Sequence, residues 1–303
     1  MTRPMIHICV TTGHQPSYQA VFVRLLGGVP STGRLRGPTF WRLVRADRVF
    51  FCTIDTDYLA FTAIALLRAF RGRPTTGLFL RPMQCFRTER PIIYAAKRCA
   101  FRVLRRLPGL RILSIIPFAV EPRLAQVCHD WIHDPQLWDL WLDGPPVLPE
   151  TDLSRRVAKA TGGRDVMIFI GAGNRIKGFD GFMDEALSRK DSVLAVVAGR
   201  VAPDFASEAQ RLADEGMIVE DRFVTDEEIL SLYKVADRAW CRYAPDYDQA
   251  SGIFGRAVQT GVTPIVREGS VVARLDDVLT NVTPDDWLRL AIPKLGIKGV
   301  GHR

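Results

Sequence analysis

A glycine-rich turn that carries two cations, Gly171-Ala-Gly-Asn-Arg-Ile-Lys-Gly178, is the strongest candidate for chemistry in the sequence. Glycines in such a turn let a ligand approach the backbone, and a following helix start favours an anion. Arg175 offers a planar fork of donors and Lys177 a point charge, both suited to phosphate. The pattern therefore predicts a phosphate site, with an ordinary surface turn as the alternative; the backbone contacts would come from Gly171, Gly173 and Asn174.

Two better-known phosphate motifs fit this turn poorly. The third glycine is displaced from its place in the dinucleotide fingerprint, and a dinucleotide site rarely needs two cations. The turn also lacks the Gly-Lys-Ser/Thr sequence of a P-loop. We therefore expect neither a nicotinamide dinucleotide nor ATP hydrolysis at this turn.

A second anion-receptive helix start is expected where the stretch Asp246-Tyr-Asp-Gln-Ala-Ser-Gly252 ends. Ser251 is a favourable N-cap residue, and Gly252 leaves the first amides of the helix open. Both helix starts follow predicted strands, and open α/β sheets bind ligands at the carboxyl ends of their strands. Two phosphate-friendly helix starts on one sheet edge indicate a diphosphate.

The elements that must position these turns alternate along the chain. The second half predicts strands at 165–170, 193–197, 217–219, 238–243 and 263–266, separated by helices at 178–189, 205–215, 226–235 and 251–260. The helix at 226 opens with a capping box formed by Thr225 and Glu228. The first half predicts a looser version of the same plan, with strands at 5–12, 48–54, 76–80 and 111–118 and helices at 58–70 and 92–107.

This alternation predicts the α/β class, with two Rossmann-like domains that face a cleft. The proline-rich stretch Asp143–Glu150 is the best linker in the 303 residues, so we place the domains at 1–150 and 151–303. Six cysteines show neither a CxxC pair nor zinc spacing, which predicts no metal centre and a reducing cytoplasm. The apolar run at the amino terminus is strand-length, so we expect no signal peptide.

Residues 164–267 resemble the donor domain of GT-B glycosyltransferases, especially the family-4-like group. The ordered matches are the turn with Arg175 and Lys177, the strand that ends at Gly199, the phrase Phe223-Val-Thr-Asp-Glu-Glu-Ile-Leu-Ser-Leu-Tyr-Lys-Val-Ala-Asp237, and Ala257 followed by Gly261-Val-Thr-Pro264. The loop Gln249-Ala-Ser-Gly252 is similar to that of a small subgroup with a Gln-x-Ser-Gly sequence. The resemblance implies a nucleoside diphosphate sugar as donor substrate and no separate cofactor.

The same resemblance assigns roles to further residues. Asp248 stands where the family has its first glutamate, which contacts the donor sugar, and Gln249 and Ala250 continue that loop. The backbone at Arg222, Phe223 and Val224 would read the base. Arg256 replaces the second glutamate, which holds the ribose in the family, so Arg256 would contact phosphate or leave the ribose to another group.

Three features of the first half carry residue types that are common in catalytic or metal sites. Gly13 and His14 follow the first strand, in a loop that the resemblance brings to the cleft, where His14 would be a general base or a donor to the sugar; a simple turn histidine is the alternative. His7 lies inside an apolar strand and is expected to be structural. Asp55 and Asp57 mimic the metal-binding DxD motif of the other glycosyltransferase fold, which the downstream motifs disfavour.

The first half is also strongly basic, since residues 1–150 hold 20 of the 41 Lys and Arg residues but 10 of the 33 Asp and Glu residues. The helix at 92–107 sets Arg and Lys beside apolar residues, which favours either an anionic membrane surface or packing on the sheet. We expect no nucleic-acid partner, because no aromatic-interleaved basic motif accompanies the charge.

Together these features predict a metal-independent glycosyltransferase that acts on a saccharide or lipid-linked saccharide in bacterial surface polysaccharide or glycolipid synthesis. It would be cytoplasmic and peripheral on the inner face of the membrane. A sugar-nucleotide epimerase of the same fold and a non-catalytic nucleotide-binding protein are the alternatives.

Overall fold

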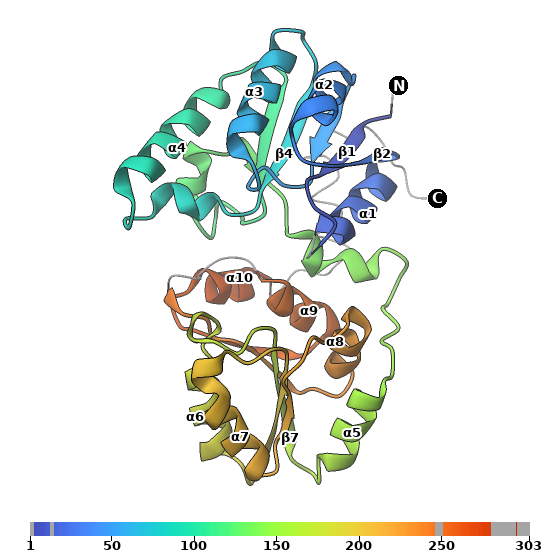
Figure 1. Ribbon diagram of the computed structural model, residues 1–303, viewed down its shortest axis with the longest axis vertical. Coiled ribbons are helices and arrows are strands. Elements are labelled where there is room, and N and C mark those ends of the chain that lie inside the picture. Colours follow the sequence, from blue (N-terminus) through green and yellow to red (C-terminus); the bar gives the residue numbers. More distant parts are fainter. Residues whose placement is uncertain (1–2, 13–14, 246–250, 280–294, 296–303) are drawn as a thin grey trace. The chain divides into compact units, whose positions relative to one another are not determined.

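The computed structural model describes residues 3–12, 15–245, 251–279 and Leu295 (Figure 1). The chain forms two compact units, the first taking the described residues up to Pro135 with Leu295, and the second those from Gln136 to Leu279. This division falls before the proline-rich stretch that sequence analysis used as the boundary. The reason is packing: residues 136–141 hydrogen-bond to a helix of the second unit, as described below.

The first unit is built on a parallel sheet in the order β2-β1-β3-β4-β5-β6. Its strands are β1 (Met5–Ile8), β2 (Val29–Thr32), β3 (Val49–Phe51), β4 (Thr75–Phe79), β5 (Leu110–Ser114) and β6 (Asp130–Trp131). The connecting helices are α1 (Gln15–Leu26), α2 (Gly37–Arg45), α3 (Tyr58–Ala69) and α4 (Pro91–Leu104), with short turns η1 (Pro82–Phe86) and η2 (Pro122–Gln126).

Helices cover both faces of this sheet, as alternation along β3 shows. Phe50 packs on Phe22 of α1, whereas Phe51 packs on Phe61 of α3. Neighbouring side chains of a strand point to opposite faces, so α1 lies on one face and α3 on the other. The core on the α3 side also contains buried side chains of α2 and α4, so these three helices share one face.

The second unit has a parallel sheet in the order β11-β10-β7-β8-β9. Its strands are β7 (Asp165–Ile170), β8 (Val193–Ala198), β9 (Ile218–Glu220), β10 (Arg238–Cys241) and β11 (Thr263–Val266). Its helices are α5 (Asp152–Ala160), α6 (Phe179–Ser188), α7 (Ala206–Asp214), α8 (Asp226–Tyr233), α9 (Gly252–Thr260) and α10 (Val271–Leu279), with η3 (Pro135–Leu137), η4 (Asp139–Trp141), η5 (Arg175–Lys177) and η6 (Pro203–Phe205). Every residue of β8 is buried, as expected of an inner parallel strand.

The carboxyl ends of the strands of the second unit meet at one edge, because all its strand pairs are parallel. The turn after β7 and the start of α9 after β10 both belong to that edge, and β7 and β10 are direct neighbours. The topology therefore brings the two predicted anion-receptive helix starts together. Among the residues that the structure describes, no helix combines the length and apolarity needed to cross a bilayer.

Candidate functional site

The turn after β7 approaches its neighbouring strand closely through glycine. Gly171 has φ +106°, a conformation that side chains disfavour. A Cβ on Gly199, which follows β8, would overlap the carbonyl oxygen of Gly171. Gly173 donates its N–H to the oxygen of Arg200 at 2.8 Å. The close approach between the ends of β7 and β8 therefore depends on Gly199, whereas Gly171 meets a backbone requirement of the turn.

Asn174 and Gly178 shape the cationic part of the turn. The Asn174 side-chain oxygen accepts the N–H of Lys177 at 3.0 Å and so caps η5. Gly178 lies in the left-handed region at φ +70°, and a Cβ there would overlap the carbonyl oxygen of Arg242. The indole N–H of Trp240 donates to the Gly178 oxygen at 3.0 Å. The turn is thereby fastened against the end of β10.

Three side chains connect the turn after β7 with the start of α9, namely those of Lys177, Tyr243 and Ser251. The Lys177 ammonium lies 4.4 Å from the ring centroid of Tyr243, close enough for a cation–π interaction. The Tyr243 hydroxyl lies 2.6 Å from the Ser251 hydroxyl at the start of α9. Burial raises the pKa of Tyr243, so the phenol stays protonated at neutral pH. Tyr243 therefore contacts a cation through its ring and the N-cap residue of α9 through its hydroxyl.

Ser251 occupies the N-cap position of α9, as expected, but its side chain makes no capping hydrogen bond. Its hydroxyl bonds to Tyr243 instead. Gly252 also has a packing reason for lacking a side chain, since a Cβ there would meet the Gln136 amide. The first N–H groups of α9 consequently donate no hydrogen bond to the side chain of their own N-cap residue.

Arg256 pairs with a carboxylate of the 136–141 segment rather than standing unengaged at the site. Its guanidinium donates both to Asp139 Oδ1 and, at 2.9 Å, to Asp139 Oδ2. The two side chains are 15% and 8% exposed, so the pair is largely shielded from water. Gln259 of the same helix accepts the Leu140 N–H at 3.0 Å. Arg256 thus helps to hold this segment on α9, and its contribution to ribose or phosphate binding stays a prediction.

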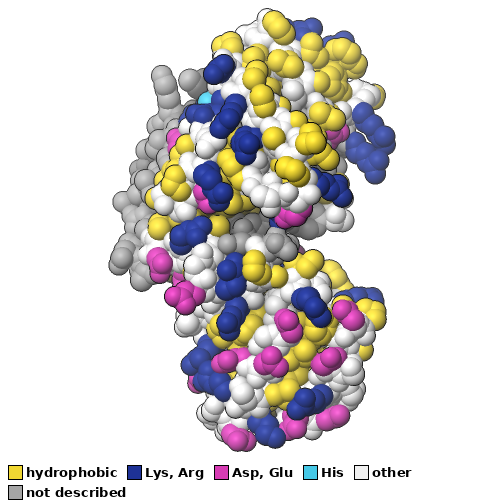
Figure 2. Space-filling model, turned by 90° about the vertical axis from the view of Figure 1, so that its left-hand side faces the viewer, with side chains coloured by type: hydrophobic (Ala, Val, Ile, Leu, Met, Phe, Trp, Pro, Cys, Tyr) yellow, Lys and Arg dark blue, Asp and Glu magenta, His cyan; other side chains and the backbone are white. Residues whose placement is uncertain are grey.

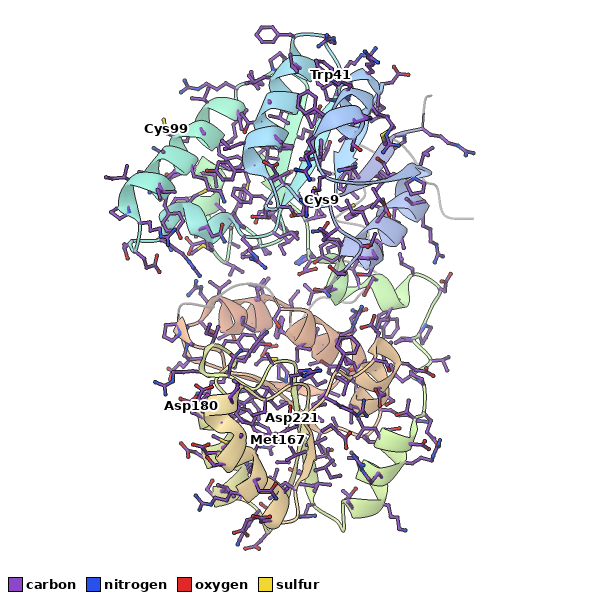
Figure 3. The ribbon with its side chains drawn as sticks, viewed as in Figure 1. Cys9, Trp41, Cys99, Met167, Asp180 and Asp221 are labelled. Carbon is purple, nitrogen blue, oxygen red and sulfur yellow. The ribbon has the colours of Figure 1, made fainter. Side chains whose placement is uncertain are left out.

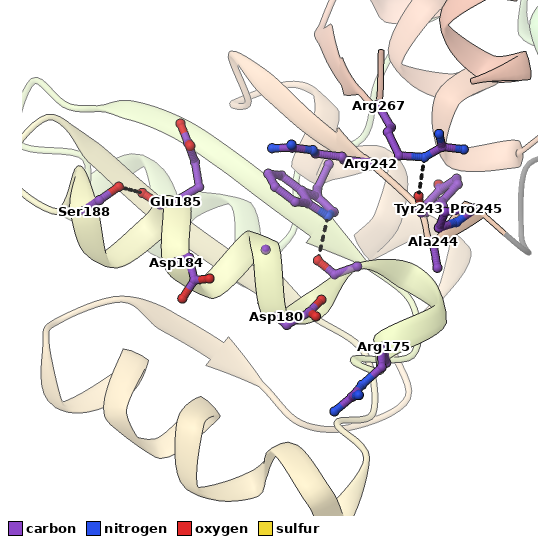
Figure 4. A pocket seen from close by; sticks show the side chains of 13 residues that line it. Arg175, Asp180, Asp184, Glu185, Ser188, Arg242, Tyr243, Ala244, Pro245 and Arg267 are labelled. Atoms are coloured by element: carbon purple, nitrogen blue, oxygen red, sulfur yellow. Dashed lines mark hydrogen bonds between the residues drawn. The ribbon is translucent and has the colours of Figure 1, made fainter. Parts of the chain in front are cut away.

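Arg175 lines a groove of about 800 Å³ between α6 and the carboxyl ends of β10 and β11, together with Arg242 and Arg267 (Figure 4). Trp240 lines the same groove, as does Tyr243, whose ring Lys177 contacts. Asp180, Asp184 and Glu185 of α6 line the same groove (Figure 4). The groove offers arginines for an anion and carboxylates for hydroxyl groups.

The predicted base-reading segment is held by an ion-pair network. Arg222 bonds to Glu228 at 2.6 Å and to Glu220 at 2.8 Å. This hydrogen bonding lowers the pKa of Glu228 to about 2 and raises that of Arg222. Thr225 and Glu228 form the predicted capping box. Phe223 is 78% exposed whereas Val224 is buried. The segment therefore exposes an aromatic ring next to a residue that is anchored in the core.

Five predicted site residues lie outside the described residues, namely Gly13, His14, Asp248, Gln249 and Ala250. The described residues beside the first loop are ordered by Gln15, whose side-chain oxygen accepts the N–H groups of Cys9 and Val10 at 3.0 and 3.2 Å.

The two aspartates of the DxD-like sequence have structural partners. Asp55 accepts the N–H of Leu80 at 2.8 Å, and burial raises its pKa. Asp57 caps α3 by accepting the N–H of Ala60 at 3.0 Å. In the described part of the chain, His, Cys, Asp and Glu form no group of three that could hold a metal ion.

Tyr243 and Asp139 are the residues that sequence reasoning missed. Tyr243 had one visible signal, as a polar aromatic residue directly after the carboxyl end of a predicted strand. Asp139 had none, because its partner Arg256 lies 117 residues further along the chain.

Comparison with known proteins tests the fold over most of the chain. No protein-family model matches the chain, and no curated protein matches its sequence. Among solved structures, Anabaena HepE in complex with UDP and glucose aligns with a TM-score of 0.58 at 11% identity, over 91% of this chain and 83% of HepE. The UDP-forming α,α-trehalose-phosphate synthase of Burkholderia vietnamiensis gives 0.57 at 9% identity, over 99% and 92%.

A candidate UDP-N-acetylglucosamine 2-epimerase from Listeria monocytogenes is also similar, with a TM-score of 0.56 at 12% identity over 97% of this chain and 88% of that one. At such low identities the likeness concerns the fold alone. The two parallel, Rossmann-like sheets of this chain lie within alignments that cover most of both chains in each case. The chain has a GT-B-like fold.

Proposed function

We propose that the protein is a glycosyltransferase that moves a sugar from a nucleoside diphosphate sugar to a saccharide or lipid-linked saccharide acceptor. The observation that carries this proposal is the junction of Lys177, Tyr243 and Ser251. It brings a cation and a helix amino terminus to one sheet edge, where a diphosphate would bind both. The complexes of HepE with UDP and with UDP-glucose support the choice of donor class.

The proposed chemistry breaks the bond between the anomeric carbon and the diphosphate oxygen and forms one to the acceptor oxygen. The acceptor hydroxyl gives up its proton, with His14 as the proposed base. Negative charge grows on the leaving diphosphate, and Lys177, Arg175 and the amides at the start of α9 would stabilise it without a metal ion. Asp248 and its loop would orient the sugar, and the backbone at 222–224 would contact the base.

Calorimetric titration with UDP, GDP and their sugars tests the donor site directly. Arg175→Ala/Lys177→Ala should weaken nucleotide binding by about a hundredfold or more, because each of the two charge-assisted hydrogen bonds contributes about 1.5–3 kcal/mol. Lys159→Ala, an exposed lysine on α5, is the matched control and should bind normally. Nucleotide affinity that is equal in all three proteins would place the donor elsewhere.

A sugar-nucleotide epimerase is the second candidate, because a candidate epimerase shares the fold over most of both chains. Incubation with UDP-N-acetylglucosamine alone separates the two. An epimerase changes the sugar without an acceptor, whereas a transferase needs an acceptor to release UDP at a comparable rate. A protein that binds the nucleotide but supports neither reaction would be the non-catalytic alternative.

The acceptor and the cellular location belong to the same proposal. A lipid-linked acceptor would place the protein at the inner face of a membrane, in synthesis of a surface polysaccharide or glycolipid. Support comes from the basic, acid-poor composition of residues 1–150.

A further inference from the structure

Helix α4 of the first unit differs from an ordinary surface helix in which of its residues are buried and which are exposed. Its buried side chains are Lys97, Phe101 and Leu104, so a cation points toward the sheet. The Lys97 ammonium donates to Gln84 at 3.1 Å and lies 5.1 Å from the ring centroids of Tyr58 and Phe79. A helix that covers a sheet normally exposes its charged residues to solvent. The burial of Lys97 therefore directs attention to the residues that α4 exposes.

The outward side of α4 is almost entirely apolar. Ile92, Ile93 and Val103 are 84%, 53% and 55% exposed. Between them lie small exposed residues, namely Ala95, Ala96, Cys99 and Ala100. Figure 3 shows Cys99 on the outer side of the helix. Exposed apolar residues that are contiguous over several turns mark an interaction surface rather than a solvated one.

Positive charge surrounds this apolar strip. Residues 58–120 contain twelve Lys and Arg residues but a single acidic residue, Glu89. Figure 2 shows this side of the first unit covered by hydrophobic and basic side chains, with few acidic ones between them. The surface therefore combines an apolar strip with a surplus of cations.

A cavity at the carboxyl end of α4 adds a place for an anionic group. It has a volume of about 460 Å³ and is lined by Arg102, Arg105, Arg106, Ala125 and Gln126. Arg102 donates to the Gln126 side chain and Arg105 to the Ala125 oxygen, which fixes two guanidinium groups at its wall. Within the described residues the buried Arg105 Nε has no hydrogen-bond partner. Three arginines around one hollow suit a phosphate, which accepts several charge-assisted bonds.

We propose that the exposed side of α4 is the surface by which this protein binds an anionic lipid bilayer, with a lipid phosphate in the Arg102–Arg105–Arg106 cavity. The apolar strip would enter the boundary between headgroups and acyl chains, and the arginines would remain at headgroup level. This surface deepens the lipid-linked acceptor of the proposed function, but bilayer binding requires neither donor nor catalysis.

The positive charge of this surface favours an anionic bilayer over a second copy of the chain as its partner. A two-fold symmetric contact would set each α4 against its own counterpart and bring like arginines together, which is unfavourable. A bilayer that contains anionic lipid offers an apolar layer and negative charge side by side, which matches both features of the surface.

Cys99 provides a probe in the middle of the strip. It is the exposed cysteine of the six, and the other five are buried. Burial raises the pKa of Cys9 and of Cys85 to about 11 and that of Cys241 to about 12, so maleimide reagents should react first with Cys99. An environment-sensitive fluorophore there should shift to the blue on vesicles of phosphatidylcholine mixed with phosphatidylglycerol, and not on phosphatidylcholine alone.

Co-sedimentation of the full chain with the same vesicles gives the partition coefficient. Arg102→Gln/Arg106→Gln should lower it roughly thirtyfold, since each arginine at the surface contributes about 1 kcal/mol. Arg105 is left in place because it holds the Ala125 carbonyl. Ile92→Ser/Val103→Ser should abolish the fluorescence shift. Arg34→Gln/Arg36→Gln removes two exposed charges beside β2, at the opposite end of the sheet, and should bind like the wild type.

Three results would overturn the proposal. The first is equal binding to neutral and anionic vesicles, unaffected by salt. The second is an equal loss of binding in the Arg34/Arg36 control. The third is a blue shift that grows with protein concentration in the absence of vesicles, which would make α4 a self-association surface. Vesicle binding by a protein that neither binds nucleotides nor transfers sugar would leave the surface standing and remove the proposed function.

Discussion

At the residue scale, the most consequential contact is the hydrogen bond between Tyr243 and Ser251, the residue that begins α9. The Ser251 backbone has φ −135° and ψ 130°, a conformation from which a serine normally caps its own helix. Here the Ser251 hydroxyl bonds to Tyr243 and makes no capping hydrogen bond. Within the described residues, the Ser251 side chain therefore does not occupy the amide donors at the start of α9, and the ring of the same tyrosine contacts Lys177.

Replacing Tyr243 by phenylalanine should therefore weaken nucleotide binding without destabilising the unit. The ring that Lys177 contacts remains, whereas the released Ser251 hydroxyl can cap α9 and occupy a donor. Loss of the Tyr–Ser bond and gain of a cap are each about 1 kcal/mol, so the melting temperature should change little. Affinity for UDP, measured calorimetrically, should fall roughly tenfold.

The double variant Tyr243→Phe/Ser251→Ala separates this positioning role from a structural one. It removes the competing hydroxyl, so UDP affinity should recover toward the wild-type value. A Tyr243→Phe protein that melts early but binds UDP normally would instead show that the bond only supports the fold.

Arg256 and Asp139 make a second prediction at this scale. Removing one member of a shielded ion pair leaves an unpaired charge, which typically costs 3–5 kcal/mol. Arg256→Gln and Asp139→Asn should therefore each lower the free energy of unfolding by about 3 kcal/mol, and the double variant should lower it no further than either single change. Chemical denaturation measures this. Additive losses, or a loss of UDP affinity confined to Arg256→Gln, would contradict a purely structural pair.

At the scale of elements, the β7–α6 turn depends on Gly178 for contact with β10. A methyl group in Gly178→Ala would meet the Arg242 carbonyl oxygen and also strain the backbone at φ +70°. We expect the turn to move away from β10, with a loss of about 3 kcal/mol or more in stability, since strain and overlap add. Because Lys177 moves with the turn, UDP binding should also weaken.

Gly163→Ala is the matched control for this change. Gly163 has φ +85°, yet a Cβ there meets nothing within 4 Å. It should cost only the conformational penalty of about 1–2 kcal/mol and leave UDP binding intact. Equal effects of the two substitutions would mean that the approach to Arg242 is unimportant.

Patterning predicted the strands and helices from β7 to β11 well, short strands such as β11 included, and missed several elements outside that segment. Strands β7 and β8 and helices α3, α6 and α8 lie within a residue or two of their expected bounds. Strand β2, with the sequence Val-Pro-Ser-Thr, carries no hydrophobic run, and sheet pairing with β1 makes it a strand. Helices α1, α2, α5 and α10 were not anticipated either. The domain boundary was placed too late because proline marks a change of local conformation, whereas the division follows packing across long sequence separation.

In the candidate site, too, features that are local in sequence were predicted and contacts between distant segments were not. The glycine turn, its cations and the start of α9 were visible because their signals are local in sequence. The Tyr243–Ser251 bond and the Arg256–Asp139 pair arise only when separate segments meet, and no spacing rule encodes them.

At the scale of the whole molecule, stability should depend on pH through buried groups that the proposed chemistry does not use. His7 is buried in β1, where its Nδ1 lies 3.1 Å from the Ser31 hydroxyl. Burial lowers its pKa from 6.5 to about 4. Asp55 acts in the opposite direction, because burial raises its pKa and folding then favours the protonated acid.

Because its pKa is lowered in the folded state, His7 decreases the free energy of unfolding as the pH falls. Between about pH 6.5 and pH 4 the unfolded chain binds a proton at His7 that the folded chain excludes. The free energy of unfolding should therefore be fully supported above pH 6.5 and fall as pH decreases, by up to about 1.4 kcal/mol for each pH unit. His7→Asn keeps a polar group toward Ser31 but cannot titrate, so the slope in this window should flatten by that amount. Urea denaturation of both proteins at several pH values measures the difference, in which the contribution of Asp55 cancels. Parallel stability curves for the two proteins would show that water reaches His7 in the folded state and that its pKa is close to the ordinary value.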